Sequence, residues 1–111
     1  MEKDNDYYRS LDLRRLAESI PTDKEARGRS AAFQEALIAL VLRCPTESFP
    51  VSDLLHYLGE PDSIESSANA EVWEYSWQGE HCGHAYRSST PFVVLNNRVV
   101  GIREKSPTAI V

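Results

Sequence analysis

The sequence predicts an α+β domain whose N-terminal helices pack on a three-stranded antiparallel sheet, with a fourth edge strand as an alternative. Three observations support this fold class. Apolar residues recur at helical spacing before Pro45, and they alternate with period two between Glu71 and Trp77. Two apolar runs near the C-terminus are separated by Asn96-Asn97, which is typical of a β-hairpin. The length of 111 residues suits a single domain.

The N-terminal part of the chain is predicted to be helical over residues 10–45. A charged segment, residues 1–9, precedes it and is predicted to be flexible. Ser10 is placed to cap a first helix, which ends before Pro21 because the residue before a proline is driven out of the α region.

A second helical segment follows and contains the main core helix. Thr22 and Glu25 have the spacing of a capping box, and the strongly periodic part begins near Ser30. This part ends at Pro45 and carries a wide apolar stripe, the pattern of a helix that faces a core. The stripe consists of Phe33, Ala36, Leu37, Leu40, Val41 and Cys44.

The remainder, residues 51–104, is predicted to form a short helix and an antiparallel meander. Ser52 is expected to cap the helix and Gly59 to end it. The first strand would carry an aromatic face made of Trp73, Tyr75 and Trp77. We expect at least two of these three rings to pack on the helical stripe.

The predicted C-terminal hairpin, residues 92–95 and 99–103, turns at Asn96-Asn97 and is apolar on both faces. One face carries Phe92, Val94 and Val99, and the other carries Val93, Leu95, Val100 and Ile102. An antiparallel sheet under one layer of helices usually leaves its other face polar. The second face should therefore be covered, by the N-terminal helices, by residues 106–111, by a second copy or by another protein.

Charge and composition exclude several classes of function. The net charge is −5, and residues 31–80 contain nine acidic residues and one basic residue, Arg43. Nucleic acids and anionic membranes both require clustered Lys and Arg, so neither is expected as a partner. The longest apolar stretch, residues 36–42, is too short to cross a bilayer, and two cysteines are too few for a disulfide scaffold. We expect a cytoplasmic protein without a cofactor.

Residues 52–62 form a helix pattern that ends in Leu-Gly-x-Pro-Asp, and strand patterns follow at residues 71–75 and 93–102. This order resembles the SmpA/OmlA (BamE-like) family over residues 51–104. The resemblance implies two helices against a three-stranded antiparallel sheet, and a binding module without catalytic apparatus that docks to proteins. The family's Gly-Met-Thr entry to the helix is replaced here by Pro-Val-Ser.

The side chains with the most chemical potential are His81, Cys82 and His84, in a predicted loop over residues 78–90. Imidazole and thiolate groups are good zinc ligands, but a structural site needs a fourth ligand from a distant segment. Alternatively, Cys82 and a neighbouring histidine could act as nucleophile and base. Residues 84–88 could instead form the extra edge strand.

The leading functional hypothesis is a non-catalytic protein-interaction module, such as an adaptor, inhibitor or immunity protein. Its predicted surface consists of the aromatic and aliphatic sheet residues Phe92, Val94, Val99, Trp73, Tyr75 and Trp77, with acidic residues steering the partner. The alternatives are a small metal-binding or thiol-dependent protein, and a homodimer. The sequence names neither a partner nor a pathway.

Overall fold

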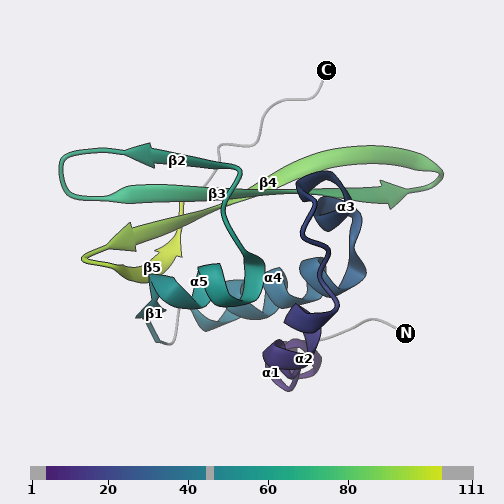
Figure 1. Cartoon of the computed structure of the whole chain (residues 1–111), viewed down its shortest axis with the longest axis horizontal. Helices are drawn as coiled ribbons and strands as arrows, with labels where there is room; N and C mark the ends of the chain where they lie inside the picture. Colours follow the sequence, from purple (N-terminus) through teal and green to yellow (C-terminus); the bar gives the residue numbers. More distant parts are fainter. Residues whose placement is uncertain (1–4, 45–46, 104–111) are drawn as a thin grey trace.

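A computed structural model describes residues 5–44 and 47–103. Five helices lie on one face of a five-stranded antiparallel sheet of order β1-β5-β4-β3-β2 (Figure 1). The helices are α1 (Asn5–Arg9), α2 (Leu13–Glu18), α3 (Lys24–Arg29), α4 (Ala31–Arg43) and α5 (Val51–Leu58). The strands are β1 (Phe49–Pro50), β2 (Ser63–Ser66), β3 (Glu71–His81), β4 (His84–Leu95) and β5 (Arg98–Ile102). The predicted α+β class is confirmed, and the sheet has more strands than predicted.

Residues 5–9, predicted to be flexible, form helix α1, and the Tyr7 hydroxyl donates a hydrogen bond to the Glu35 carboxylate at 3.2 Å. The helix starts also differ from the prediction, except at Ser30, whose hydroxyl accepts from the Phe33 amide. The caps of α2 and α3 are Asp12 and Asp23. A carboxylate accepts more strongly from backbone amides than a neutral hydroxyl does, which favours these two caps.

The short helix α5 begins directly after β1, so Ser52 does not cap it. Pro50 occupies the N-cap position without a side-chain hydrogen bond, and the Val51 amide donates to the Asn97 carbonyl at 2.9 Å. The predicted end is confirmed, because Gly59 takes the positive φ of 81° that suits glycine.

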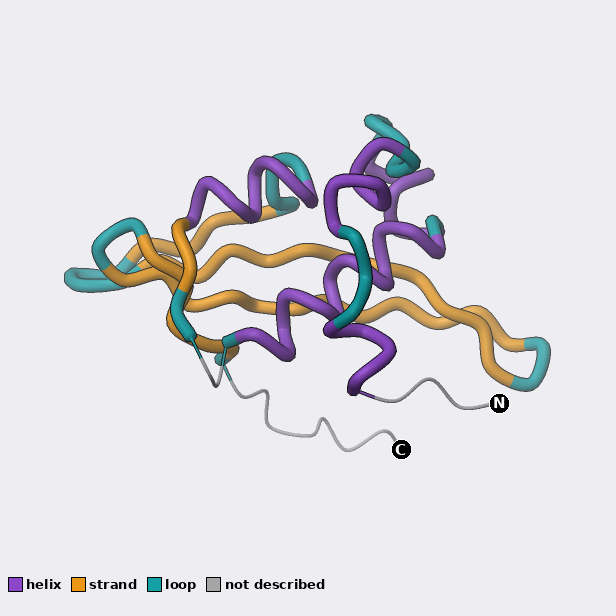
Figure 2. Tube along the Cα trace, turned by 90° about the horizontal axis from the view of Figure 1, so that it is seen from below, coloured by secondary structure: helices purple, strands orange, loops and turns teal. Residues whose placement is uncertain are grey.

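The predicted loop over residues 78–90 is wrong. These residues continue β3 and β4 into one long hairpin, whose tip projects past the helices (Figures 1 and 2). The two-residue turn is Cys82-Gly83, with φ of 51° and 80°, as a type I′ turn requires. A sequence rich in Gly, His and Ser can therefore form strand when each residue has a partner across the hairpin.

The second hairpin turns at Asn96-Asn97, with φ of 50° and 64°, as predicted. A β-bulge changes the faces beyond the turn. Val94 lies opposite Val99 but Val93 lies opposite Gly101, so Val100 is an extra residue. Ile102 consequently shares the helix-side face with Phe92, and not the opposite face that simple alternation predicts.

The core lies between the sheet and helices α4 and α5. Its largest fully buried side chains are Tyr75, Phe33, Phe92, Leu40, Leu54, Leu58 and Val99. Tyr75 packs edge-on against Phe92 at a ring distance of 5.9 Å, and burial raises the pKa of its hydroxyl. No described helix is both long enough and apolar enough to cross a membrane.

A buried guanidinium joins α3 to the end of α5. Arg27 is only 4% exposed, and its Nη1 donates to the carbonyls of Leu58 at 3.1 Å and Glu60 at 2.7 Å. Its Nη2 lies 3.2 Å from the Asp62 carboxylate. The guanidinium carbon lies 5.1 Å from the centre of the Phe33 ring. Hydrogen bonds and cation–π contact together offset the cost of burying the charge.

We predict that Arg27→Met lowers the free energy of unfolding by about 3 kcal/mol, because two carbonyls and a carboxylate lose their donor. Urea unfolding followed by tryptophan fluorescence measures this change. Arg29→Met is the control, since Arg29 lies on the same helix, is exposed and forms a long ion pair of 3.9 Å with Glu25. Its effect should stay below about 0.5 kcal/mol. Equal effects of the two substitutions would contradict the role of Arg27.

Candidate protein-interaction surface

Most of the predicted interface residues belong to the core. Phe92 and Val99 are fully buried and Val94 is 3% exposed, so a partner cannot reach them in this chain. The helical layer covers them, which was one of the alternatives for this face. On β3, Tyr75 and Trp73 are also buried, as expected for at least two of the three aromatic residues. Trp77 alone of the six is half-buried.

Other apolar residues are exposed, and most of them lie on strands. The large exposed ones are Leu55 on α5 and Ile64, Tyr86, Leu95 and Val100 on strands. Exposed apolar residues on a sheet are typical of binding surfaces when they adjoin a groove. Sequence alternation did not single out Ile64 or Tyr86, because neither lies in a long alternating run.

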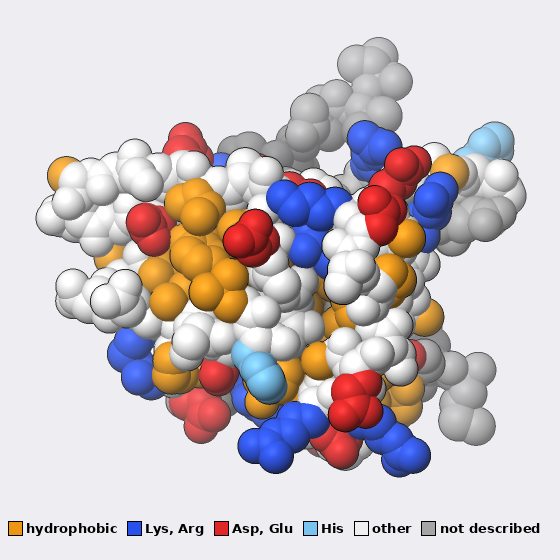
Figure 3. All heavy atoms as spheres, in the orientation of Figure 1, with side chains coloured by type: hydrophobic (Ala, Val, Ile, Leu, Met, Phe, Trp, Pro, Cys, Tyr) orange, Lys and Arg blue, Asp and Glu red, His pale blue; other side chains and the backbone are white. Residues whose placement is uncertain are grey.

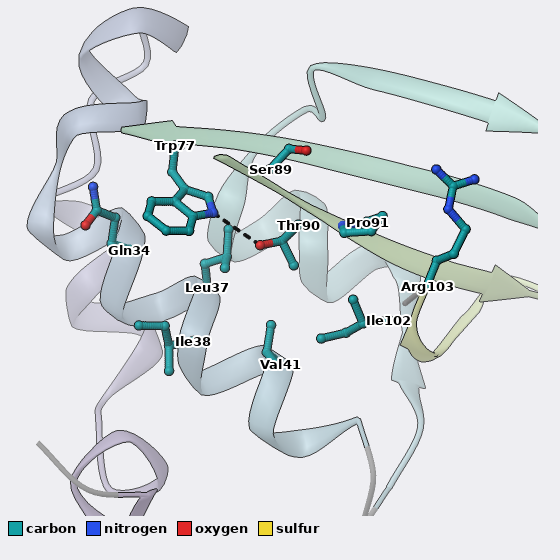
Figure 4. Close-up of a pocket in the computed structure, with 10 residues that line it drawn as sticks. All are labelled: Gln34, Leu37, Ile38, Val41, Trp77, Ser89, Thr90, Pro91, Ile102 and Arg103. Atoms are coloured by element: carbon teal, nitrogen blue, oxygen red, sulfur yellow. Dashed lines mark hydrogen bonds between the residues drawn. The ribbon is translucent and has the colours of Figure 1, made fainter. Parts of the chain in front are cut away.

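An apolar pocket of about 350 Å³ lies between α4 and the part of β4 where β5 ends (Figure 4). Its walls are mostly aliphatic and aromatic side chains from four elements. They include Leu37, Ile38 and Val41 of α4, Trp77 of β3, Pro91 of β4 and Ile102 of β5. The volume is within the range of protein ligand pockets. Ile102 reaches this pocket because the bulge at Val100 turns it to the helix side.

The pocket adjoins one edge of the long hairpin. The Arg103 amide donates to the Pro91 carbonyl at 3.0 Å, after which no described strand pairs with this side of β4. Backbone groups alternate in direction along a strand, so those of Ala85 and Arg87 face the same side as the Pro91 carbonyl. We call residues 84–88, on this side, the free edge of β4.

The other edge of the hairpin is covered by side chains. The Asp62 carboxylate accepts from the Ser76 amide at 2.7 Å, and the Gln34 amide group donates to the Gln78 carbonyl at 2.6 Å. Helix α3 lies against this edge, and a Cβ on Gly28 would lie 3.4 Å from the Ser76 carbonyl oxygen. On the β3 edge, the Ser76 amide and the Gln78 carbonyl therefore have partners where β2 no longer pairs with the strand.

Two aromatic rings, one of which lines the pocket, pack against each other on the hairpin. Trp77 lines the pocket and donates from Nε1 to the Thr90 hydroxyl at 3.3 Å (Figure 4). Its ring also packs edge-on against the Tyr86 ring at a distance of 5.7 Å. The Tyr86 ring lies across Gly79, where any Cβ would overlap it. Glycine at position 79 thus lets the exposed Tyr86 ring extend from β4 over β3.

The His81-Cys82-His84 cluster lies at the tip of the hairpin. The described residues contain no group of three side chains that could hold a metal ion, although the His81 side chain lies outside them. Cys82 and His84 are exposed. Cys44 is buried in the core, and burial raises the pKa of its thiol to about 11, which disfavours the reactive thiolate.

No family model, curated protein or solved structure matches this chain significantly. The resemblance to the SmpA/OmlA family stays a prediction.

The two thiols should differ strongly in reactivity. Near neutral pH, a thiol reagent such as DTNB is expected to modify Cys82 at once and Cys44 only after unfolding, because Cys82 is exposed and Cys44 is buried and protonated. Absorbance of the released thiolate counts the reacting groups. The Cys82→Ser chain should lose the fast reaction, and a fast reaction that persists in this variant would contradict the burial of Cys44.

Proposed function

We propose that this chain is a non-catalytic protein-interaction module that binds an extended segment of a partner by strand addition at the free edge of β4. The observation that carries the proposal is the unpaired strand edge directly beside an apolar pocket. Main-chain pairing would supply affinity, and the pocket would supply specificity, as in other strand-addition complexes.

The uneven cover of the hairpin supports this proposal. Proteins usually protect exposed strand edges, because an open edge can pair with any other chain. Here Asp62, Gln34 and α3 cover the β3 edge, whereas no described residue of another element hydrogen-bonds to residues 84–88 of β4. An extended segment of a partner would cover the β4 edge, which has less cover than the β3 edge.

The pocket indicates which side chains the segment would carry. Side chains of an added strand point alternately to the two faces of the sheet. Those on the helix side would meet Ile38, Val41 and Ile102. The pocket's polar groups are already engaged, since Gln34 binds the Gln78 carbonyl and Thr90 binds Trp77. An aliphatic side chain at every second position would therefore bind best.

Arg87→Pro should abolish binding at the free edge without unfolding the chain. Proline removes the amide that faces the edge, and the ladder to β3 is kept because Arg87 does not donate to β3. The matched control, Arg87→Gln, removes the charge but keeps the amide and should still bind. The probe is a set of peptides selected from a random phage-displayed library on the unmodified chain, with affinity measured by fluorescence anisotropy.

Hydrogen exchange locates the bound peptide. Peptides that bind as proposed should slow exchange of the Ala85 and Arg87 amides. Selected peptides that bind the Arg87→Pro chain as tightly as the unmodified chain, or that leave these two amides unprotected, would overturn strand addition at this edge.

A further inference from the structure

The helix-side face of the sheet loses its cover toward β2. Ile64, Trp73 and Phe92 lie opposite one another on neighbouring strands and point to the same face. Their exposed fractions rise from 0% at Phe92, through 8% at Trp73, to 48% at Ile64. On α5, the helix nearest this strip, Leu55 is 44% exposed. The layer of helices therefore ends at α5 and leaves an apolar strip of sheet beyond it.

Leu55, Ile64 and Trp73 line one shallow pocket, and we call these three residues the α5–β2 patch. Figure 3 shows an apolar area between the positions of β2 and α5, with acidic side chains beside it. Contiguous apolar surface of this kind marks interaction sites on soluble proteins.

Carboxylates border the α5–β2 patch. Glu60 and Asp62 line the same pocket, and Glu71 accepts a hydrogen bond from the indole Nε1 of Trp73 at 3.1 Å. Asp62 is paired with Arg27, whereas neither Glu60 nor Glu71 forms an ion pair within the described part of the chain. Residues 44–80, which supply α5, β2 and most of β3, contain no Lys or Arg. From α3, Lys24 donates to the Pro61 carbonyl and Arg27 pairs with Asp62, so the carboxylates left without an ion pair among the described residues of this border are Glu60 and Glu71.

We propose that the α5–β2 patch binds a cationic amphipathic helix of a partner protein. The apolar stripe of that helix would cover Leu55 and Ile64, and Lys or Arg on its flanks would face Glu60 and Glu71. A helix suits the site because the bare strip continues the existing helical layer beside α5. The patch is separate from the free edge of β4, because β2 borders the hairpin on its β3 side.

The probe is an amidated helical peptide with leucine at positions i, i+3, i+4 and i+7 and lysine elsewhere. A second peptide with glutamate in place of lysine controls for charge. In the Trp77→Phe chain, Trp73 is the remaining tryptophan, so its emission reports binding at the patch. The lysine peptide should bind about tenfold more tightly than the glutamate peptide, and the difference should shrink in high salt.

Two matched substitutions test the location. Ile64→Lys should weaken binding of the lysine peptide at least about tenfold, because it places a like charge in the centre of the patch. Val100→Lys changes a similarly exposed β-branched residue elsewhere on the sheet, 40% exposed, and should leave binding unchanged. Glu60→Gln should weaken binding about threefold and reduce its salt dependence.

Three outcomes would overturn the proposal. Equal affinity for the lysine and glutamate peptides would remove the role of charge, and unchanged binding to the Ile64→Lys chain would remove the location. Self-association of the unmodified chain that Ile64→Lys abolishes would mean that a second copy covers the patch. The Arg87→Pro chain should bind the lysine peptide normally, which separates a failure here from a failure of strand addition at β4.

Discussion

The buried guanidinium of Arg27 determines how the helices meet the sheet. It holds the carbonyls at the end of α5 and the carboxylate of Asp62, and it packs on the Phe33 ring. Asp62 in turn accepts from the Ser76 amide on β3. One cation therefore links α3, the end of α5 and the edge of β3. A neutral side chain could fill the same space, but it could not supply donors to three acceptors at once.

The two candidate surfaces are the free edge of β4 and the α5–β2 patch. Both lie where the layer of helices and capping side chains over the sheet ends. Helix α3 and the side chains of Asp62 and Gln34 protect β3, and no comparable group from another described element protects β4 at residues 84–88. On the other side, α5 ends the helical layer before it reaches β2. The molecule therefore offers an edge with basic Arg87 and a patch with acidic Glu60. If both bind, the chain is an adaptor that holds two chemically different partners.

Local rules predicted the parts of the fold that depend on neighbouring residues. The start of the main helix near Ser30 and the type I′ turn at Asn96-Asn97 follow from local periodicity and backbone preferences alone. The strands β1 and β2 were missed because they are short, and pairing with distant strands defines them. Burial of Arg27 was missed for a related reason, since its acceptors lie more than thirty residues away. Of the candidate site, the sequence indicated Trp77 and offered residues 84–88 as an edge strand, and these residues do lie in β4 beyond its pairing with β5. The sequence did not indicate that this edge adjoins an apolar pocket, because the pocket is built from elements far apart in the chain.

The bulge at Val100 has a consequence for how this protein would be compared with its relatives. Ile102 lies in the wall of the pocket only because one extra residue separates it from the turn. A chain that lacked this residue would keep nearly the same composition and hydrophobicity, yet its isoleucine would point to the opposite face. The pocket thus depends on the number of residues between the turn and Ile102 as much as on which residues these are. Spacing between the turn and the end of β5 would separate relatives that keep the pocket from those that have lost it.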